Sequence, residues 1–320
     1  MATPQKITVP IDAVITWVDS EDSKRQKAIE SYLLKNNEST KLKVKSSGKN
    51  LQEVKYVVHS ILKYAPFIRY IFIVTGKQIP PFLRSSDHIS YLKVKLIDHQ
   101  TIFNKDISFL PTFNSISIET KLYQIPGLAE HFIYFNDDVL LLKQTFATDF
   151  FIDGKPVIRG KWKRFKEHIF YKKFQVRKRK PQPSYVLAQE KSAKIIGFEK
   201  LFKFHHTPFP MRVSTLKSFF LKNPNLELNN IKHKFRNKEQ FLTQGVANHL
   251  EIKNNTCIIV QDYQLIHFRH YKKPIHWLKF KLSYLSNRKK KLFLNLQDLD
   301  SCPENKMAFI IEWLEKKYKI

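Results

Sequence analysis

The chain has 320 residues, of which 42% are hydrophobic, and carries a formal charge of +28. This apolar content supports a substantial core and excludes an intrinsically disordered chain. No uncharged apolar run of about 18 residues occurs, and the first residues lack the basic and apolar segments of a secretory signal, so we expect a soluble, cytoplasmic protein. Cys257 and Cys302 are the only cysteines, too few for a disulfide framework or a cysteine-rich metal site.

The excess of Lys and Arg indicates an anionic partner or environment. Nucleic acid, acidic lipid and a phosphorylated substrate all fit, and charge alone does not choose among them. A mutational bias toward codons for Lys, Asn, Phe and Ile is an alternative source of part of this composition. We therefore look to particular residues for function.

Buried strands and helices alternate along the first half of the chain. We expect strands at 11–18, 68–76, 91–99 and 132–138, and helices at 20–36, 51–66 and 113–128. Such alternation predicts an open, doubly wound α/β fold with a mostly parallel sheet. Ligands bind beyond the carboxyl ends of the strands in these sheets, so polar residues that follow the strands should converge on one cleft.

The stretch "FIYFNDDVLLL" places Asn136, Asp137 and Asp138 between two apolar runs. Paired carboxylates at a strand end are suited to a hard divalent ion such as Mg²⁺, which prefers oxygen ligands and shares its coordination with substrate phosphates. Neighbours in a strand point to opposite faces, so we expect one aspartate to bind metal and the other to cap the turn. An ordinary turn is the alternative interpretation.

Further candidates lie in the second half of the chain. His205 and His206 precede "TPFP", whose prolines restrict the backbone, and a histidine is suited to proton transfer with a hydroxyl substrate. Arg236 could bind phosphate through its planar guanidinium group. Each of these is alternatively an incidental loop or surface residue. No Gly-rich phosphate loop, zinc spacing or Gly-x-Ser-x-Gly motif appears.

Residues 161–180 form a basic belt with ten Lys or Arg, one acid and interspersed aromatic residues. Nucleic acid, anionic lipid or an acidic polysaccharide could bind such a segment. The second half has no linker or internal repeat. We therefore expect one catalytic domain over 1–320, with a Rossmann-like core at 1–150 and a basic, acceptor-side elaboration at 151–320 that completes the site.

Four blocks of the sequence together resemble the Stealth family of sugar-phosphate transferases. They are "IDAVITWVDSED", then the long series from "VKYVVHSILKYAPFIRYIFIVTG" to "HFIYFNDDVLL", then "HHTPFPM" with "KFRNKEQF", and last "FLNLQD". The second block is the most specific. The resemblance implies a Rossmann-like core related to nucleotide-sugar transferases and an enzyme of bacterial capsule or exopolysaccharide synthesis.

The implied reaction moves a sugar 1-phosphate, typically of a hexosamine, from a UDP-sugar to a hydroxyl of a glycan. A phosphodiester forms and UMP leaves. The resemblance also implies dependence on Mg²⁺ or Mn²⁺. An ordinary glycosyltransferase that releases UDP, or a non-enzymatic protein that binds polyanions or membrane surfaces, are the alternatives.

Site residues follow from the resemblance by position. His206 becomes the candidate base, Arg236 the phosphate-binding arginine, and Asp137 and Asp138 the metal and diphosphate ligands, with Asp138 also catalytic. The expected substrate-binding residues are Trp17, Asp19, Asn136, His205, Gln297, Asp298, Lys178 and Arg179. Gln297 stands where the family usually has Asn, which leaves its role open.

The expected partners are a UDP-sugar donor and an anionic glycan acceptor, without nucleic acid. We assign the basic belt to the acceptor and to peripheral contact with the anionic inner face of the membrane. The sugar, the linkage, the oligomeric state and the number of additions are not encoded in any pattern that we can interpret.

Overall fold

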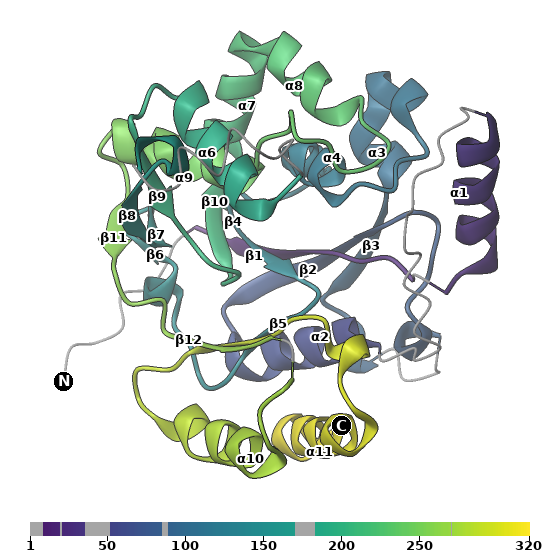
Figure 1. Ribbon diagram of the computed structural model, residues 1–320, viewed down its shortest axis with the longest axis vertical. Coiled ribbons are helices and arrows are strands. Elements are labelled where there is room, and N and C mark those ends of the chain that lie inside the picture. The colour runs from purple at the N-terminus through teal and green to yellow at the C-terminus, as the bar shows by residue number, and fades with distance from the viewer. Residues whose placement is uncertain (1–8, 20, 36–51, 85–88, 170–182, 270) are drawn as a thin grey trace.

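The computed structural model describes residues 9–19, 21–35, 52–84, 89–169, 183–269 and 271–320 (Figure 1). Its central sheet has the order β10-β4-β1-β2-β3. β1 (Ile11–Thr16), β2 (Ile68–Thr75), β3 (Val94–Asp98) and β4 (His131–Asn136) are parallel, and β10 (Phe209–Arg212) pairs antiparallel with β4. The predicted α/β fold with a mostly parallel sheet is confirmed.

Smaller sheets flank the central one. The first has the order β12-β13-β5, from β12 (Leu265–Phe268), β13 (Phe293–Leu296) and β5 (Val139–Leu141). A second joins β11 (Ile258–Val260), β7 (Lys155–Arg159) and β6 (Phe151–Ile152), and a hairpin pairs β8 (Lys161–Arg164) with β9 (Lys200–Lys203). Strands from the second half of the chain therefore pair directly with strands from the first.

Helices cover both faces of the central sheet (Figure 1). On one face, α2 (Glu53–Tyr64) packs against the sheet, and α10 (Ile275–Ser283) and α11 (Glu304–Tyr318) lie beyond α2 and contribute to the same hydrophobic core. The other packs against α3 (His99–Phe103), α4 (Ser115–Thr120), α6 (Tyr185–Ile195), α7 (Val213–Lys222), α8 (Pro224–Ile231) and α9 (Thr243–Lys253). α1 (Ser23–Lys35) completes the set of α-helices in the described residues.

The strand residues alternate between two hydrophobic cores, as period-2 geometry requires. In β1, Ala13 and Ile15 belong to one core, whereas Val14 belongs to the other. In β4, Phe135 belongs to the first core and Tyr134 to the second. When a sheet is buried on both sides, the sequence of each strand is a continuous apolar run, which is why these strands were recognisable in the sequence.

Two expected boundaries were wrong. The helix predicted over 113–128 is the short α4 followed by a 3₁₀ turn, Leu122–Gln124. The helix predicted from residue 20 starts instead at Ser23, and Ser20 lies outside the described residues. No helix in the described part of the chain is long and apolar enough to cross a membrane.

Candidate active site

Asp137 and Asp138 form the junction between two sheets. β4 ends at Asn136 in the central sheet, and β5 begins at Val139 in the three-stranded sheet β12-β13-β5. The two aspartates are the turn between them, at the carboxyl edge of β4. Apolar strands on both sides hold the pair in place, while the turn keeps the side chains only partly covered.

The environment of this pair opposes negative charge. Burial and the charge of Asp138 raise the pKa of Asp137 to about 7. Burial, with a contribution from Asp298, raises the pKa of Asp138 to about 6. The Oδ1 atom of Asp138 is buried without a hydrogen-bond partner. A buried carboxylate oxygen with no donor is costly even though Asn295 hydrogen-bonds the same carboxyl group, so this arrangement favours a bound cation.

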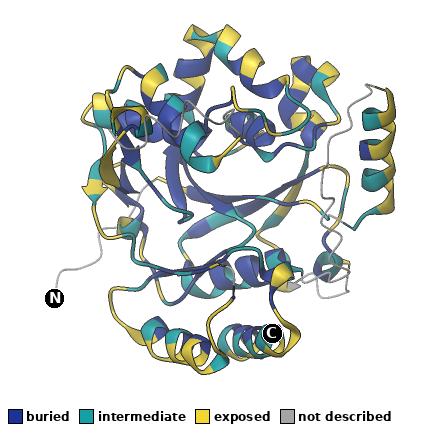
Figure 2. Cartoon of the chain, in the orientation of Figure 1, coloured by how far each residue is buried: buried dark blue, intermediate teal, exposed yellow. Residues whose placement is uncertain are grey.

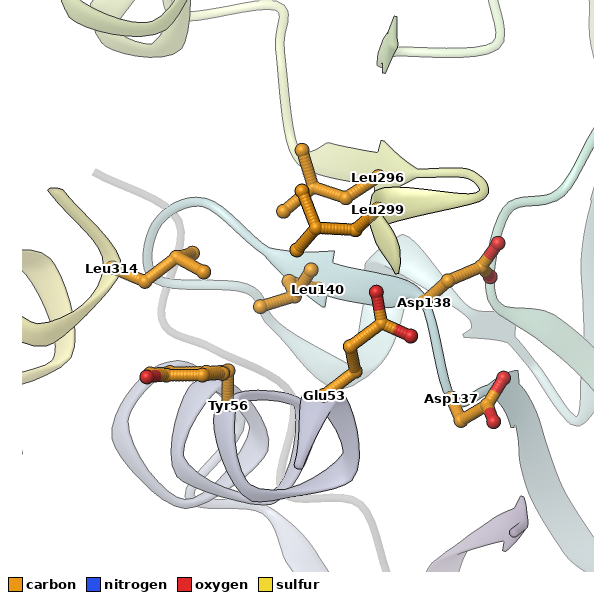
Figure 3. Close-up of a pocket in the computed structure, with 8 residues that line it drawn as sticks. All are labelled: Glu53, Tyr56, Asp137, Asp138, Leu140, Leu296, Leu299 and Leu314. Atoms are coloured by element: carbon orange, nitrogen blue, oxygen red, sulfur yellow. The ribbon is translucent and has the colours of Figure 1, made fainter. Parts of the chain in front are cut away.

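Glu53 is a third acid at this place and was absent from the sequence prediction. It is the first residue of α2 and lines one pocket with Asp137 and Asp138 (Figure 3). Burial, followed by the charges of the two aspartates, raises its pKa well above the usual value, and its Oε1 atom has no hydrogen-bond partner. At the sequence level Glu53 is indistinguishable from an ordinary acidic residue in a first helical turn.

The carboxylates are suited to a divalent ion whose remaining coordination positions would be filled by substrate and water. Among the described residues, no group of three His, Cys, Asp or Glu side chains is arranged to hold a metal ion by itself. Mg²⁺ usually takes one or two carboxylates and keeps other positions for water and substrate phosphate. The unpartnered Oδ1 of Asp138 and the raised pKa values of both aspartates match such an open site.

His206 lies beside the aspartate junction. Its Nδ1 is 2.5 Å from Nδ2 of Asn136, and its ring stacks on Tyr185 at 4.4 Å between centroids. Burial, with nearby positive groups that include His267 and Arg236, lowers the pKa of His206 to about 4. The imidazole is therefore uncharged at neutral pH and has a fixed ring plane.

Arg236 is brought to the same edge by a loop that Asn114 anchors. The amide of Asn114 donates to the carbonyl oxygens of His233 and Phe235, at 3.1 and 2.9 Å, and to Oε1 of Gln240. The guanidinium of Arg236 donates to Oγ of Ser115 at 3.1 Å. Its positive charge counteracts the burial that raises the pKa of Asp137.

Glu119, on α4, is a further acid that the sequence prediction missed. It is 7% exposed and accepts hydrogen bonds from the Tyr134 hydroxyl at 3.1 Å and from Nε2 of Gln244 at 2.9 Å. Burial raises its pKa, and the charge of Arg236 acts in the opposite direction. No local signal marked it, because Glu119 lies in "SISIET", where two serines and a threonine already make polar residues common.

The three-stranded sheet carries residues from the end of the chain to the aspartate junction. β12 and β13 pair His267 with Asn295, and β13 pairs Asn295 with Val139 of β5. The Asn295 amide donates to the backbone oxygen of Asp138 at 3.3 Å. The negative charge of Asp298 contributes to the raised pKa of Asp138, so Asp298 lies near the aspartate pair, and its expected role in substrate binding stays a prediction.

Gln297 contacts a histidine that the sequence prediction missed. Its Oε1 is 3.2 Å from Nε2 of His267, so His267 donates from Nε2. The ring of His267 is 6.4 Å from that of His205, which in turn packs edge-on against Tyr263 at 4.5 Å. Burial lowers the pKa of His205 to about 4. His205 and His267 thus lie side by side, with their rings 6.4 Å apart.

Trp17 and Asp19, two of the expected substrate-binding residues, have different surroundings. Trp17 is 8% exposed and belongs to a hydrophobic core. The Asp19 backbone N–H donates to Oε1 of Gln78 at 2.9 Å, and its carboxylate accepts from the N–H of Glu21. Asp19 follows β1 at the carboxyl edge of the sheet, as predicted, and its hydrogen bonds link it to Gln78 and Glu21.

Two expected acceptor residues, Lys178 and Arg179, lie outside the described residues. So does the whole second half of the basic belt, residues 171–180. The first half is described as β8 and the residues after it. All four residues of β8 are exposed, in agreement with the expected charged surface. The assignment of the belt to an anionic polymer stays a prediction.

An open α/β sheet with buried acids, neutral histidines and an arginine beyond its carboxyl edge is the arrangement of a ligand-binding α/β protein. Residues 48–157 match Stealth protein CR2, conserved region 2. The chain therefore carries this Stealth region, and the resemblance drawn from the sequence is confirmed. The region includes both aspartates, Glu53 and Glu119.

Curated relatives match a little under half of the chain. A capsular polysaccharide phosphotransferase, fcs1, of Haemophilus influenzae is 44% identical over 144 residues, which are 45% of this chain and 38% of that protein. An exopolysaccharide phosphotransferase, cps2G, of Lactiplantibacillus plantarum is 40% identical over 149 residues, 46% of this chain and 41% of that protein. The matches thus span about two fifths of these relatives.

Solved structures resemble the chain loosely over most of its length. The galactosyltransferase LgtC, in complex with donor and acceptor sugar analogues, has a TM-score of 0.48 and 11% identity, covering 96% of this chain and 95% of that one. Mouse xyloside xylosyltransferase 1 in its apo form has a TM-score of 0.45 and 11% identity, covering 92% and 100%. The site described above does not depend on these similarities.

Proposed function

We propose that this protein transfers a sugar 1-phosphate from a UDP-sugar to a hydroxyl of a glycan in capsule or exopolysaccharide synthesis. The observation that carries the proposal is the placement of the Asp137–Asp138 junction, within the matched Stealth region, beside His206 and Arg236. Relatives that match a little under half of this chain are capsular polysaccharide and exopolysaccharide phosphotransferases by name. We further propose that the sugar is a hexosamine.

In the proposed reaction the acceptor oxygen attacks the phosphorus next to the sugar. A new P–O bond forms to the acceptor, and the bond from that phosphorus to the oxygen bridging the two phosphates breaks. UMP leaves with the bridging oxygen. The sugar keeps its C1–O bond, which distinguishes this transfer from glycosyl transfer.

Phosphoryl transfer asks a protein mainly to position the reactants and to balance charge. We assign Asp137 and Asp138 to hold Mg²⁺ or Mn²⁺, which when bound would neutralise diphosphate oxygens. Arg236 offers a planar donor group to the transferring phosphoryl group. Asn114 holds the loop that carries Arg236, and the exposed guanidinium donates to Oγ of Ser115, so it lies on the aspartate side of the sheet while it stays open to substrate.

His206 is our candidate for the group that accepts the proton of the acceptor hydroxyl. Its lowered pKa keeps the ring uncharged and able to accept a proton at neutral pH. A free lone pair at Nε2 requires that Nδ1 donates to Oδ1 of Asn136. With Nδ2 of Asn136 facing Nδ1, as found, Nε2 carries the hydrogen instead. A half-turn of the Asn136 amide therefore sets His206 for its role as a base.

A donor labelled at the phosphate next to the sugar tests the proposal. We expect purified protein, Mg²⁺ and a capsule-type acceptor to move the label from a UDP-hexosamine into the glycan product. Release of the label as UDP, with an unlabelled glycan product, would instead establish an ordinary glycosyltransferase. Asp138→Ala should abolish label transfer, whereas a protein that only binds polyanions would show no transfer before or after the substitution.

A further inference from the structure

The helix α10 presents a basic and aromatic face that plays no part in the proposed reaction. Trp277, Phe280 and Tyr284 are 38%, 54% and 51% exposed. Their spacing of three and four residues places them on one side of the helix. Leu278 and Leu282, on the opposite side, are buried in the core. Trp277 also packs edge-on against the buried Phe268, at 6.2 Å between ring centroids, whereas Phe280 and Tyr284 stack on each other at 5.0 Å. Phe280 and Tyr284 therefore form the outward-facing part of this aromatic stripe.

The charge around α10 has one sign. Residues 263–297 contain nine Lys or Arg and neither Asp nor Glu. The exposed members closest in sequence to the aromatic stripe are Lys272, Lys273, Lys279, Arg288, Lys289 and Lys290. The adjoining α11 carries three acids and three lysines, so it does not cancel this charge. Lys281 is not free, because it donates to the His267 carbonyl oxygen at 2.6 Å.

We propose that this α10 face docks on the surface of an anionic lipid bilayer. Helices that lie in a membrane interface combine apolar aromatic residues with Lys and Arg, and the basic residues are drawn to acidic headgroups. Phe280 has no polar group with which to bind a sugar or a soluble polyanion by hydrogen bonds. Its exposed ring gains most by entering the boundary between headgroups and acyl chains.

A second copy of the chain is a poorer partner for the same face. In a symmetric dimer the face would meet itself, and the Lys and Arg side chains of 263–297 would oppose one another without an acid from the same segment. An anionic membrane matches both the charge and the aromatic stripe. This proposal goes beyond the transfer reaction and does not require it.

Flotation of the purified protein with vesicles tests the proposal. We expect binding to phosphatidylcholine vesicles that contain phosphatidylglycerol and little binding to phosphatidylcholine alone. Replacing Lys272, Lys273 and Lys279 with Gln should weaken binding at least about tenfold at low salt. Phe280→Ser should weaken it in high salt as well, because its contribution is apolar.

A matched control lies at the opposite end of the molecule (Figure 1). α7 also exposes Lys217, Leu221 and Lys222. The helices at this end of the molecule carry exposed, yellow segments in Figure 2. Replacing these lysines with Gln and Leu221 with Ser should leave vesicle binding unchanged. Thermal unfolding of each variant separates a loss of docking from a loss of folding.

Three results would overturn the proposal. One is equal vesicle binding by the α10 variants and the wild type. Another is no binding to anionic vesicles together with α10-dependent binding to soluble heparin, which would make the face a site for polyanionic polymers. The third is a dimer in sedimentation that Phe280→Ser dissociates. Transfer to a water-soluble acceptor should be unchanged in the α10 variants, so failure of the docking proposal would leave the proposed reaction intact.

Discussion

The amide of Asn136 lies 2.5 Å from Nδ1 of His206, across 70 residues of sequence. β10, which follows His206, pairs with β4, which ends at Asn136. The central sheet therefore sets this contact. It joins the aspartate junction to the histidine that we assign as the base. Asn136 is therefore a positioning residue, and the two orientations of its amide group select which nitrogen of His206 carries the hydrogen.

Substitutions of Asn136 distinguish two roles for His206, a base that accepts a proton at Nε2 and a hydrogen-bond donor from Nε2. Asn136→Asp provides only acceptor oxygens, so Nδ1 of His206 must donate and Nε2 is left free to accept a proton. We expect Asn136→Ala to lower kcat about 10- to 100-fold and Asn136→Asp to retain more activity at pH 8 than Asn136→Ala.

The pH dependence of the Asn136→Asp variant gives a second readout. A carboxylate beside the imidazole raises its pKa, so the acid limb of the rate profile should move to higher pH than in the wild type. If Asn136→Asp is less active than Asn136→Ala at every pH, His206 acts as a hydrogen-bond donor instead of a base.

Removing the charge of Asp138 should reduce activity without unfolding the protein. We expect Asp138→Asn to lower the transfer rate at least about 100-fold. Its thermal midpoint in metal-free buffer should equal or exceed that of the wild type, because Oδ1 has no partner and nearby acids repel it. Asp153→Asn, in an exposed turn with positive φ that Asn tolerates, is the control and should change neither quantity.

Divalent ions should stabilise the protein through the aspartate junction. Bound metal favours the folded state, and we expect Mg²⁺ or Mn²⁺ to raise the thermal midpoint of the wild type in the presence of UDP. The increase should disappear in Asp137→Asn and in Asp138→Asn. An undiminished increase in both variants would place the metal elsewhere.

Gln297 and His267 should act as a unit. Gln297→Ala removes the acceptor that holds His267 Nε2, and Gln297→Asn shortens the side chain by one methylene group. We expect Gln297→Ala and His267→Ala each to reduce kcat/KM about tenfold, and the double substitution to cost little more than either alone. Additive losses would show that Gln297 contacts substrate independently of His267.

His249 provides a pH-dependent contribution to stability outside the site. It is fully buried, donates from Nδ1 to the Gly245 carbonyl oxygen at 2.7 Å and accepts at Nε2 from the Phe202 N–H at 3.2 Å. Burial lowers its pKa to about 4, below the value of about 6.5 in an unfolded chain. The folded state therefore needs the neutral ring. Its contribution is complete above about pH 6.5 and is lost as the pH falls toward 4.

Urea unfolding at several pH values checks this contribution. We expect His249→Gln to be less stable than the wild type by about 1–3 kcal/mol at pH 8, and the difference to shrink between about pH 6.5 and 4. His276→Gln, at an exposed position, is the control. A difference that stays constant with pH would contradict a neutral His249 in the folded state.

The fold was predictable where burial on both sides of a sheet leaves continuous apolar runs, as in β1, β2 and β4. Asp137 and Asp138 were recognisable for the same reason, since two acids interrupt such a run. Glu53, Glu119 and His267 were not, because each occupies a position where a polar residue is unremarkable locally. Only the packing of α2 and α4 on the two faces of the central sheet, and the pairing of β12 with β13 beside it, gives them their surroundings.

The nucleotide released from a UDP-sugar tests the central claim most directly. Purified protein, Mg²⁺, a panel of UDP-sugars and a capsule-type acceptor would be incubated, and the products separated by chromatography. The account predicts UMP, together with a phosphodiester in the glycan. Release of UDP, with a glycosidic bond in the product, would contradict it.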